Sequence, residues 1–89
     1  MHKEFIDMNN ILVCLGAGKS QIPVIRAAKH LDYIVVAVDR DNTAPGFGFA
    51  DVVFNLSTHE PDPIINALDG YLKKSKNTSH VTGIINRSS

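Results

Sequence analysis

Apolar residues are concentrated in four short runs, each bounded by polar or glycine-containing segments. The runs cover residues 11–15, 33–38, 52–56 and 81–85, and valine and isoleucine dominate them. Continuous apolar runs of about four to eight residues are typical of strands buried on both faces of a parallel sheet. The pattern therefore predicts four strands.

Two segments between these runs carry apolar residues at helical spacing. The first helix is expected after the run 11–15, with Ser20 as its candidate N-cap and Pro23 in its first turn. Its apolar stripe consists of Ile22, Val24, Ile25, Ala28 and Leu31. The second helix is expected from about residue 63 to residue 74, and its stripe consists of Ile64, Ile65, Leu68, Tyr71 and Leu72.

The order of these elements predicts an α/β fold. Residues 41–50 show neither the helical nor the strand period of apolar residues. They are expected to form an irregular connection, in which Phe47 and Phe49 pack against the sheet. With right-handed crossovers, the chain becomes a half-Rossmann-like, three-layer fold with helices on both faces of a four-stranded parallel sheet, in the strand order 3-2-1-4. The strand 81–85 would then lie at an edge and expose Val81, Ile84 and Ile85.

A chain of 89 residues is too short for more than one ordinary domain. We expect an amino-terminal extension, residues 1–9, followed by one domain, residues 10–89. The exposed edge strand favours the amino-terminal part of a longer protein, or one partner of an assembly, over an isolated domain. A homodimer is one form of such an assembly.

Composition and charge exclude several classes of protein. Lysine and arginine number 9, as do aspartate and glutamate, so the net charge is zero and the basic patch of a nucleic-acid-binding protein is missing. No apolar stretch approaches the roughly 20 residues that cross a bilayer, and we expect a cytoplasmic protein. Cys14, the only cysteine, is expected to be a small buried apolar residue, and no histidine pair has metal-ligand spacing.

The segment LGAGKSQIP, residues 15–23, joins the first strand to the first helix. A Walker A loop ending in Gly-Lys-Ser would need a glycine at position 13, which is Val13, so this interpretation is set aside. A dinucleotide-binding turn fits better, because Gly16 and Gly18 follow a strand and Asp39 comes 21 residues after Gly18, although Gln21 replaces the third glycine. A tight turn without a ligand, an anion site and an NAD(P) site all remain open.

With these motifs in view, the chain resembles the amino-terminal, pre-ATP-grasp domain of ATP-grasp ligases, the superfamily of biotin carboxylase, the large subunit of carbamoyl phosphate synthase and several purine-synthesis enzymes. The matching pieces are ILVCLGAGKSQIPVIRAAKHLDYIVVAVDRD, APGFGFADVVFNLSTHEPDPII and GIINRSS, which together cover nearly all of the chain from Asn10 onward. Gln21, a departure from the dinucleotide pattern, agrees with this family's pattern.

The resemblance implies that the full-length protein is an ATP-dependent ligase. Such enzymes convert a carboxylate to an acyl phosphate, which an amine or another nucleophile then attacks. ATP and Mg²⁺ would bind between later domains, outside this segment, and the segment alone would not be catalytic. Its partners would be the rest of the same polypeptide and a small carboxylate or amine substrate.

Carried over position by position, the resemblance implies a substrate-binding edge at the carboxyl ends of neighbouring strands. Its residues would be Gly16, Gly18, Lys19, Ser20, Gln21, Asp39, Arg40, Arg87 and Ser88. Asp39 as a cap of its own turn, and Arg87 as a solvated residue near the chain end, are the structural alternatives. At the level of the whole protein, the alternatives are an NAD(P)- or nucleotide-binding module that uses Gly16, Gly18 and Asp39, and a non-catalytic module whose apolar edge binds a partner.

Overall fold

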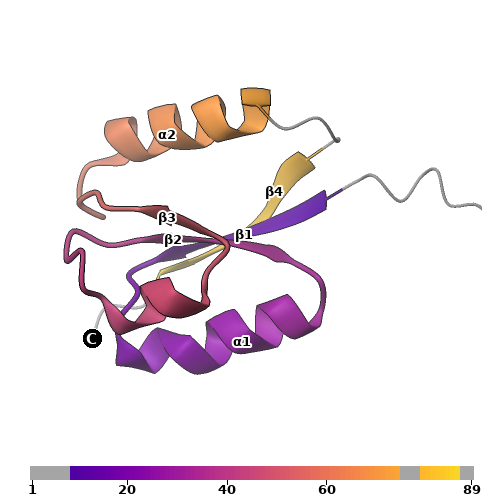
Figure 1. The fold of residues 1–89 in the computed structure, drawn as a ribbon. Coiled ribbons are helices and arrows are strands. Elements are labelled where there is room, and N and C mark those ends of the chain that lie inside the picture. The colour runs from indigo at the N-terminus through magenta and orange to yellow at the C-terminus, as the bar shows by residue number, and fades with distance from the viewer. Residues whose placement is uncertain (1–8, 75–78, 87–89) are drawn as a thin grey trace, which may run out of the picture.

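The four expected strands form one parallel sheet in the computed structural model, which describes residues 9–74 and 79–86 (Figure 1). The strands are β1 (Asn9–Leu15), β2 (Ile34–Val38), β3 (Val52–Phe54) and β4 (Ser79–Asn86). Their order is β3-β2-β1-β4, and all three pairings are parallel. The half-Rossmann-like sheet and its strand order are therefore confirmed.

Strand β3 is shorter than the apolar run predicted. It ends at Phe54, because the next residues turn away from the sheet: the N–H of Leu56 donates to the carbonyl of Phe54 at 3.0 Å. The amide Nδ2 of Asn55 donates to the carbonyl of Asp39 at 2.9 Å, which ties this turn to the end of β2.

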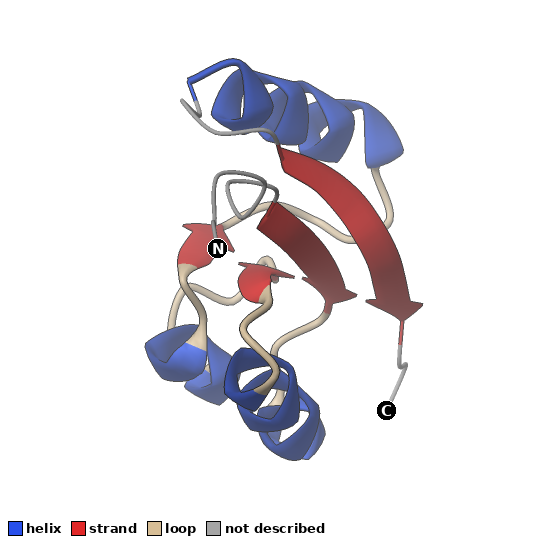
Figure 2. Cartoon of the chain, turned by 90° about the vertical axis from the view of Figure 1, so that its right-hand side faces the viewer, coloured by secondary structure: helices blue, strands red, loops and turns tan. Residues whose placement is uncertain are grey.

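Helices cover both faces of the sheet, as expected of a three-layer fold. A 3₁₀ turn, η2 (Lys19–Gln21), leads directly into α1 (Ile22–His30), and a second 3₁₀ turn, η3 (Pro45–Phe49), lies on the same face. Helix α2 (Pro61–Lys74) covers the opposite face (Figures 1 and 2). It starts two residues earlier than the expected residue 63, and the segment 41–50 is less irregular than predicted because it contains η3.

Alternation along the strands divides the core into two sides. On the α2 side, the buried cluster consists of Ile11, Val13, Val36, Val38 and Ile64. On the α1 side, one cluster consists of Cys14, Ile25, Ala28 and Val35, and another joins Ala17, Ala37 and Ala44. Cys14 is fully buried, as predicted, and burial raises the pKa of its thiol above the ordinary value.

Three residues expected to pack against the sheet are exposed instead. Leu31 is 71% exposed, because α1 ends at His30 and the chain turns through Asp32, with a φ of 66°, into β2. Ile65 is 59% exposed on α2, where its neighbour Ile64 takes the buried position. Phe49 is 40% exposed and lies under the guanidinium group of Arg26, 5.8 Å from the ring centre. Phe47, in contrast, packs against the alanine cluster as predicted.

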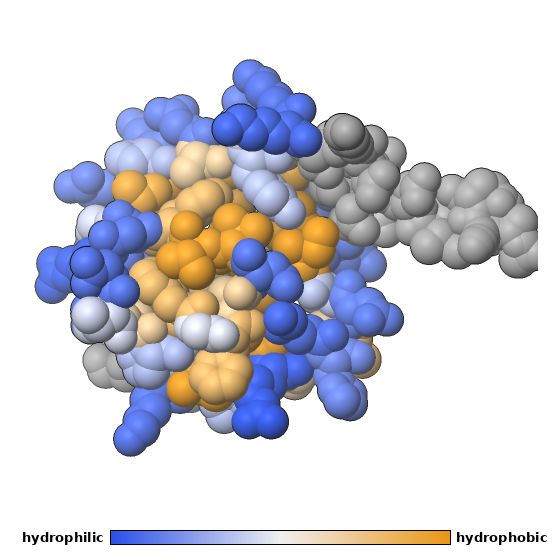
Figure 3. Space-filling view, viewed as in Figure 1, coloured by the Kyte–Doolittle hydropathy of each residue, from blue (hydrophilic) through white to orange (hydrophobic). Residues whose placement is uncertain are grey.

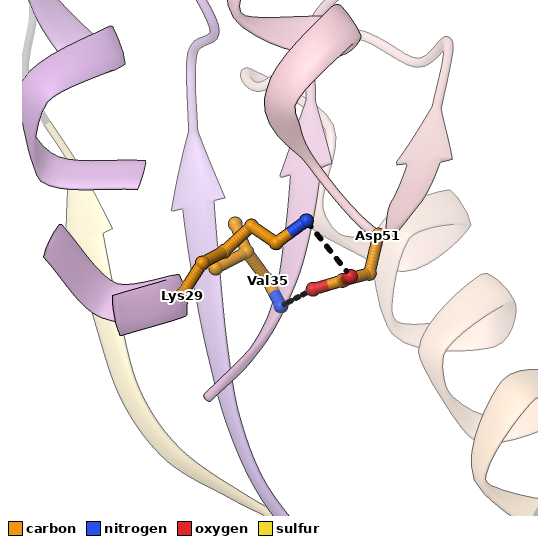
Figure 4. Close-up of polar contacts among 3 residues, drawn as sticks. All are labelled: Lys29, Val35 and Asp51. Carbon is orange, nitrogen blue, oxygen red and sulfur yellow. Dashed lines mark hydrogen bonds and ion pairs between the residues drawn. The ribbon is translucent and has the colours of Figure 1, made fainter. Parts of the chain in front are cut away.

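Asp51 fixes the beginning of β3 to β2 (Figure 4). Its Oδ2 accepts a hydrogen bond from the N–H of Val35 at 2.8 Å, and its own N–H donates to the carbonyl of Val35 at 2.9 Å. Its Oδ1 lies 3.3 Å from Nζ of Lys29 on α1. One side chain thus joins α1, β2 and β3.

Within the described residues, no helix is both long enough and apolar enough to cross a membrane.

Candidate functional site

The site expected from the sequence centres on the glycine turn between β1 and η2. Gly16 has a φ of 105°, a conformation that side chains with a Cβ rarely adopt, and its N–H donates to the carbonyl of Val38 at 2.7 Å. The chain therefore turns sharply at the carboxyl end of β1 and stays attached to the end of β2. The prediction that Ser20 caps the first helix is wrong. Ser20 lies within η2, through which the chain enters α1, and no side-chain hydrogen bond caps either element.

Asp39 holds the turn in place from the end of β2. Its Oδ2 accepts a hydrogen bond from the N–H of Ala17 at 2.8 Å, and its Oδ1 accepts one from the N–H of Asp41 at 2.9 Å. Both carboxylate oxygens thus have partners within the chain. This geometry matches the structural role that the sequence left open for Asp39, and it joins two residues that are far apart in the chain.

Gln21 fills the space beneath the turn. It is only 1% exposed, and its Nε2 donates to the carbonyl of Gly16 at 3.2 Å, whereas its Oε1 has no partner within the described residues. In a dinucleotide-binding turn this position is a glycine, which allows the helix to approach the strand closely. Here the space between the turn and the helix is occupied by a buried amide side chain.

Gly46 supports the turn from the other side, and sequence reasoning did not single it out. Its N–H donates to the carbonyl of Ala17 at 2.7 Å, and a Cβ on Gly46 would lie 2.7 Å from the same oxygen. Only a glycine allows η3 to pack this closely against the turn. Gly46 lies in the segment APGFGFADVVFNLSTHEPDPII that carries the resemblance, but only the fold brings it next to Ala17.

Three consecutive N–H groups at the start of η2 have no hydrogen-bond acceptor within the described residues. Those of Gly18, Lys19 and Ser20 donate to no acceptor within residues 9–74 and 79–86, and the side chains of Lys19 and Ser20 are exposed. Gly18 has an ordinary extended backbone, and a Cβ there would meet nothing within 4 Å. Free amides at the start of a helix attract anions, and the Lys19 ammonium group adds positive charge nearby. The turn can therefore bind a carboxylate or a phosphate.

The other residues predicted for the site are Arg40, Arg87 and Ser88. Arg40 is exposed in the turn after Asp39. Arg87 and Ser88 lie outside the described residues, directly after Asn86, which pairs with Leu15 at the carboxyl end of the sheet. In the same region, Asp41 accepts hydrogen bonds from the hydroxyl group of Thr43 at 2.7 Å and from its N–H at 2.9 Å. These bonds lower the pKa of Asp41 below its ordinary value.

Among the residues described, no set of three histidine, cysteine, aspartate or glutamate side chains is arranged to hold a metal ion. Comparisons of the chain with protein-family models, with curated proteins and with solved structures found no match.

Proposed function

We propose that this chain is the amino-terminal, substrate-side domain of an ATP-dependent carboxylate–amine ligase of the ATP-grasp type. In this proposal, the turn formed by residues 16–21 binds an anionic group of the substrate. ATP and Mg²⁺ bind to later parts of the full-length protein, where the acyl phosphate forms. The 89-residue chain binds and orients, and does not catalyse the reaction alone.

The observation that carries the proposal is that the N–H groups of Gly18, Lys19 and Ser20 have no acceptor within the described residues. They lie at the carboxyl end of β1, next to the end of β2, which is where ligands bind in open α/β sheets. Gly18 needs neither its small size nor an unusual backbone angle for the fold itself. A glycine without a structural reason, beside free amides, is consistent with close approach of a ligand to the backbone.

The geometry favours this function over an NAD(P)-binding module. A dinucleotide site uses the acidic residue after the second strand to bind a ribose hydroxyl group, but both oxygens of Asp39 already accept backbone hydrogen bonds. Gln21 also takes the place of the glycine that allows the helix to pack closely against the strand in a dinucleotide-binding turn. A small anion needs neither of these features.

A titration followed by amide NMR tests the proposal. Acetate, inorganic phosphate and NAD are added separately to the ¹⁵N-labelled chain, and we expect acetate or phosphate to shift the amide signals of Gly18, Lys19 and Ser20. The Gly18→Val substitution adds a branched side chain to the turn, where it should hinder the close approach of an anion to the backbone. It should weaken binding by about tenfold, which corresponds to about 1.4 kcal/mol.

Gly48→Val is the matched control. A Cβ at Gly48 also meets nothing within 4 Å, and Gly48 lies in η3 rather than in the turn formed by residues 16–21. Its affinity for the anion should equal that of the wild type. Turn amides that stay unmoved by acetate and phosphate would contradict the proposal. Shifts caused by NAD alone would favour the dinucleotide-binding module instead.

A further inference from the structure

Gln21 is a polar side chain in a part of the molecule that is otherwise apolar. On the face shown in Figure 3, hydrophilic side chains lie around the outside, and apolar side chains gather between the two helical layers. Among the described residues, Gln21 is the only buried one with a polar or charged side chain. Burying a polar group costs free energy unless the group is hydrogen-bonded, so a buried amide requires a physical reason.

Folding stability does not supply that reason. The Nε2 of Gln21 donates to the carbonyl of Gly16 at 3.2 Å, the long end of the usual range, and Oε1 has no donor within the described residues. A buried acceptor without a donor costs free energy. An apolar side chain of similar length would fill the same space without this cost. The benefit of the amide therefore lies in its contact with Gly16.

The carbonyl of Gly16 completes the attachment of the glycine turn to the rest of the fold. Three of the four backbone N–H and C=O groups of Gly16 and Ala17 are hydrogen-bonded to other segments of the chain. Their partners, at 2.7 or 2.8 Å, are Val38, Asp39 and Gly46. The fourth group is the carbonyl of Gly16, and its donor is Gln21 at the end of η2. All four groups of the turn are therefore held only while the amide is present.

This attachment matters for binding because the N–H groups of Gly18, Lys19 and Ser20 follow directly in the chain. Gly16 has no Cβ and a φ of 105°, so its own backbone restricts the turn little. N–H groups that already have a fixed direction bind an anion without the entropy cost of ordering the loop. Gln21 thus affects an anion through the turn, without touching it.

We propose that Gln21 is a positioning residue, which holds the glycine turn in its anion-binding conformation at a cost to folding stability. The inference rests on the function proposed above, since it assigns a role within the same site. It changes the role that the resemblance implies for Gln21, because a side chain that is 1% exposed does not contact a substrate directly. If Gln21 served the core instead, its removal would lower stability and leave the turn unchanged.

Gln21→Met tests the positioning role, because methionine has a similar length but lacks the N–H donor. In the ligand-free chain, ¹⁵N relaxation gives the backbone order parameters of Ala17, Gly18 and Lys19. They should be about 0.85 in the wild type, as in rigid backbone, and fall toward about 0.6, the limit of flexible backbone, in the variant. The dissociation constants for acetate and inorganic phosphate should rise about tenfold. The urea midpoint of unfolding should stay the same or rise.

Val35→Ala is the control, because it removes buried apolar atoms at the start of β2 and leaves the hydrogen bonds of the turn in place. It should lower the urea midpoint but change neither the order parameters of the turn nor the affinity for anions.

Unchanged order parameters in Gln21→Met would overturn the proposal, as would unchanged affinity for an anion that the wild type binds. A fall of the urea midpoint as large as in Val35→Ala would also overturn it, because the amide would then serve folding. Relaxation needs no ligand, so it decides the role of Gln21 even if the wild type binds no anion. That last result would contradict the proposed function alone.

Discussion

At the scale of single residues, the three glycines near the turn have different roles. Gly16 provides a positive φ, Gly46 allows close packing, and Gly18 satisfies no such requirement of the fold. The sequence places all three in segments expected to be turns or loops, but the physical reason for each glycine comes from its surroundings. Mutations can therefore separate folding from binding at positions that look alike in the sequence.

Gly46→Ala should lower the free energy of unfolding by about 1–3 kcal/mol, the usual cost of forcing extra atoms into a packed interior. The added Cβ would lie 2.7 Å from the carbonyl oxygen of Ala17, and this backbone group cannot move without shifting the turn. Chemical denaturation measures the loss. Gly48→Ala, in the same 3₁₀ turn but with open space around it, should change stability by no more than about 0.5 kcal/mol. Equal losses in the two variants would show that the packing argument is wrong.

At the scale of elements, Asp51 links α1 to β2 and β3 through its side chain. Its hydrogen bond to Val35 extends the pairing of β2 and β3 beyond the short strand β3. Its ion pair with Lys29 is partly open to solvent, since the two side chains are 43% and 35% exposed. The hydrogen bond should therefore contribute more to stability than the ion pair does.

Asp51→Ala should lower the free energy of unfolding by about 1–2 kcal/mol, because the N–H of Val35 loses its charged acceptor. Lys29→Met keeps the length of the side chain but removes its charge, and should cost at most about 0.5 kcal/mol. Urea denaturation of both variants gives the comparison. If Lys29→Met destabilised the protein as much as Asp51→Ala, the ion pair would be the dominant contact.

At the scale of the whole molecule, the two helical layers are anchored unequally. The α1 side contributes the buried residues Gln21, Ile25 and Ala28, whereas Ile64 is the buried residue of α2. Leu68, Tyr71 and Leu72 of the α2 stripe are only partly buried, and Ile65 is exposed. Local opening should thus separate α2 from the sheet before α1.

Native-state hydrogen exchange tests this difference between the layers. Amides in the middle of α2 should exchange through an opening of lower free energy than amides in the middle of α1. Ile64→Ala should enlarge the difference, and it should destabilise the whole chain by about 2–5 kcal/mol if α2 unfolds together with the sheet. Uniform protection of the two helices would show instead that the layers unfold as one unit.

Most of the fold was predictable because its signals are local. Apolar runs of strand length and a helical stripe follow from side chains that are neighbours in sequence, and the handedness of crossovers then restricts the strand order. The ends of elements were less predictable. Leu31 fits the helical period but lies beyond the end of α1, and β3 ends early because of the turn at Asn55.

The position of the candidate site at the carboxyl end of β1 also followed from the sequence, because a parallel strand leading into a helix places its loop there. The hydrogen bonds and contacts within the site did not follow from the sequence. Asp39 and Ala17 are 22 residues apart, and their hydrogen bond, like the contact between Gly46 and Ala17, exists only when β2 and η3 lie beside the turn.

The sequence by itself determined the elements, their parallel arrangement and the location of the glycine turn, because these depend on the period of apolar residues and on local backbone preferences. Only the tertiary structure decided that Asp39 binds the turn, that Gln21 lies buried beneath it, and that Ile65 of the α2 stripe remains exposed. These outcomes depend on which segments, distant in the sequence, pack against one another. The same local sequence pattern is compatible with more than one such packing.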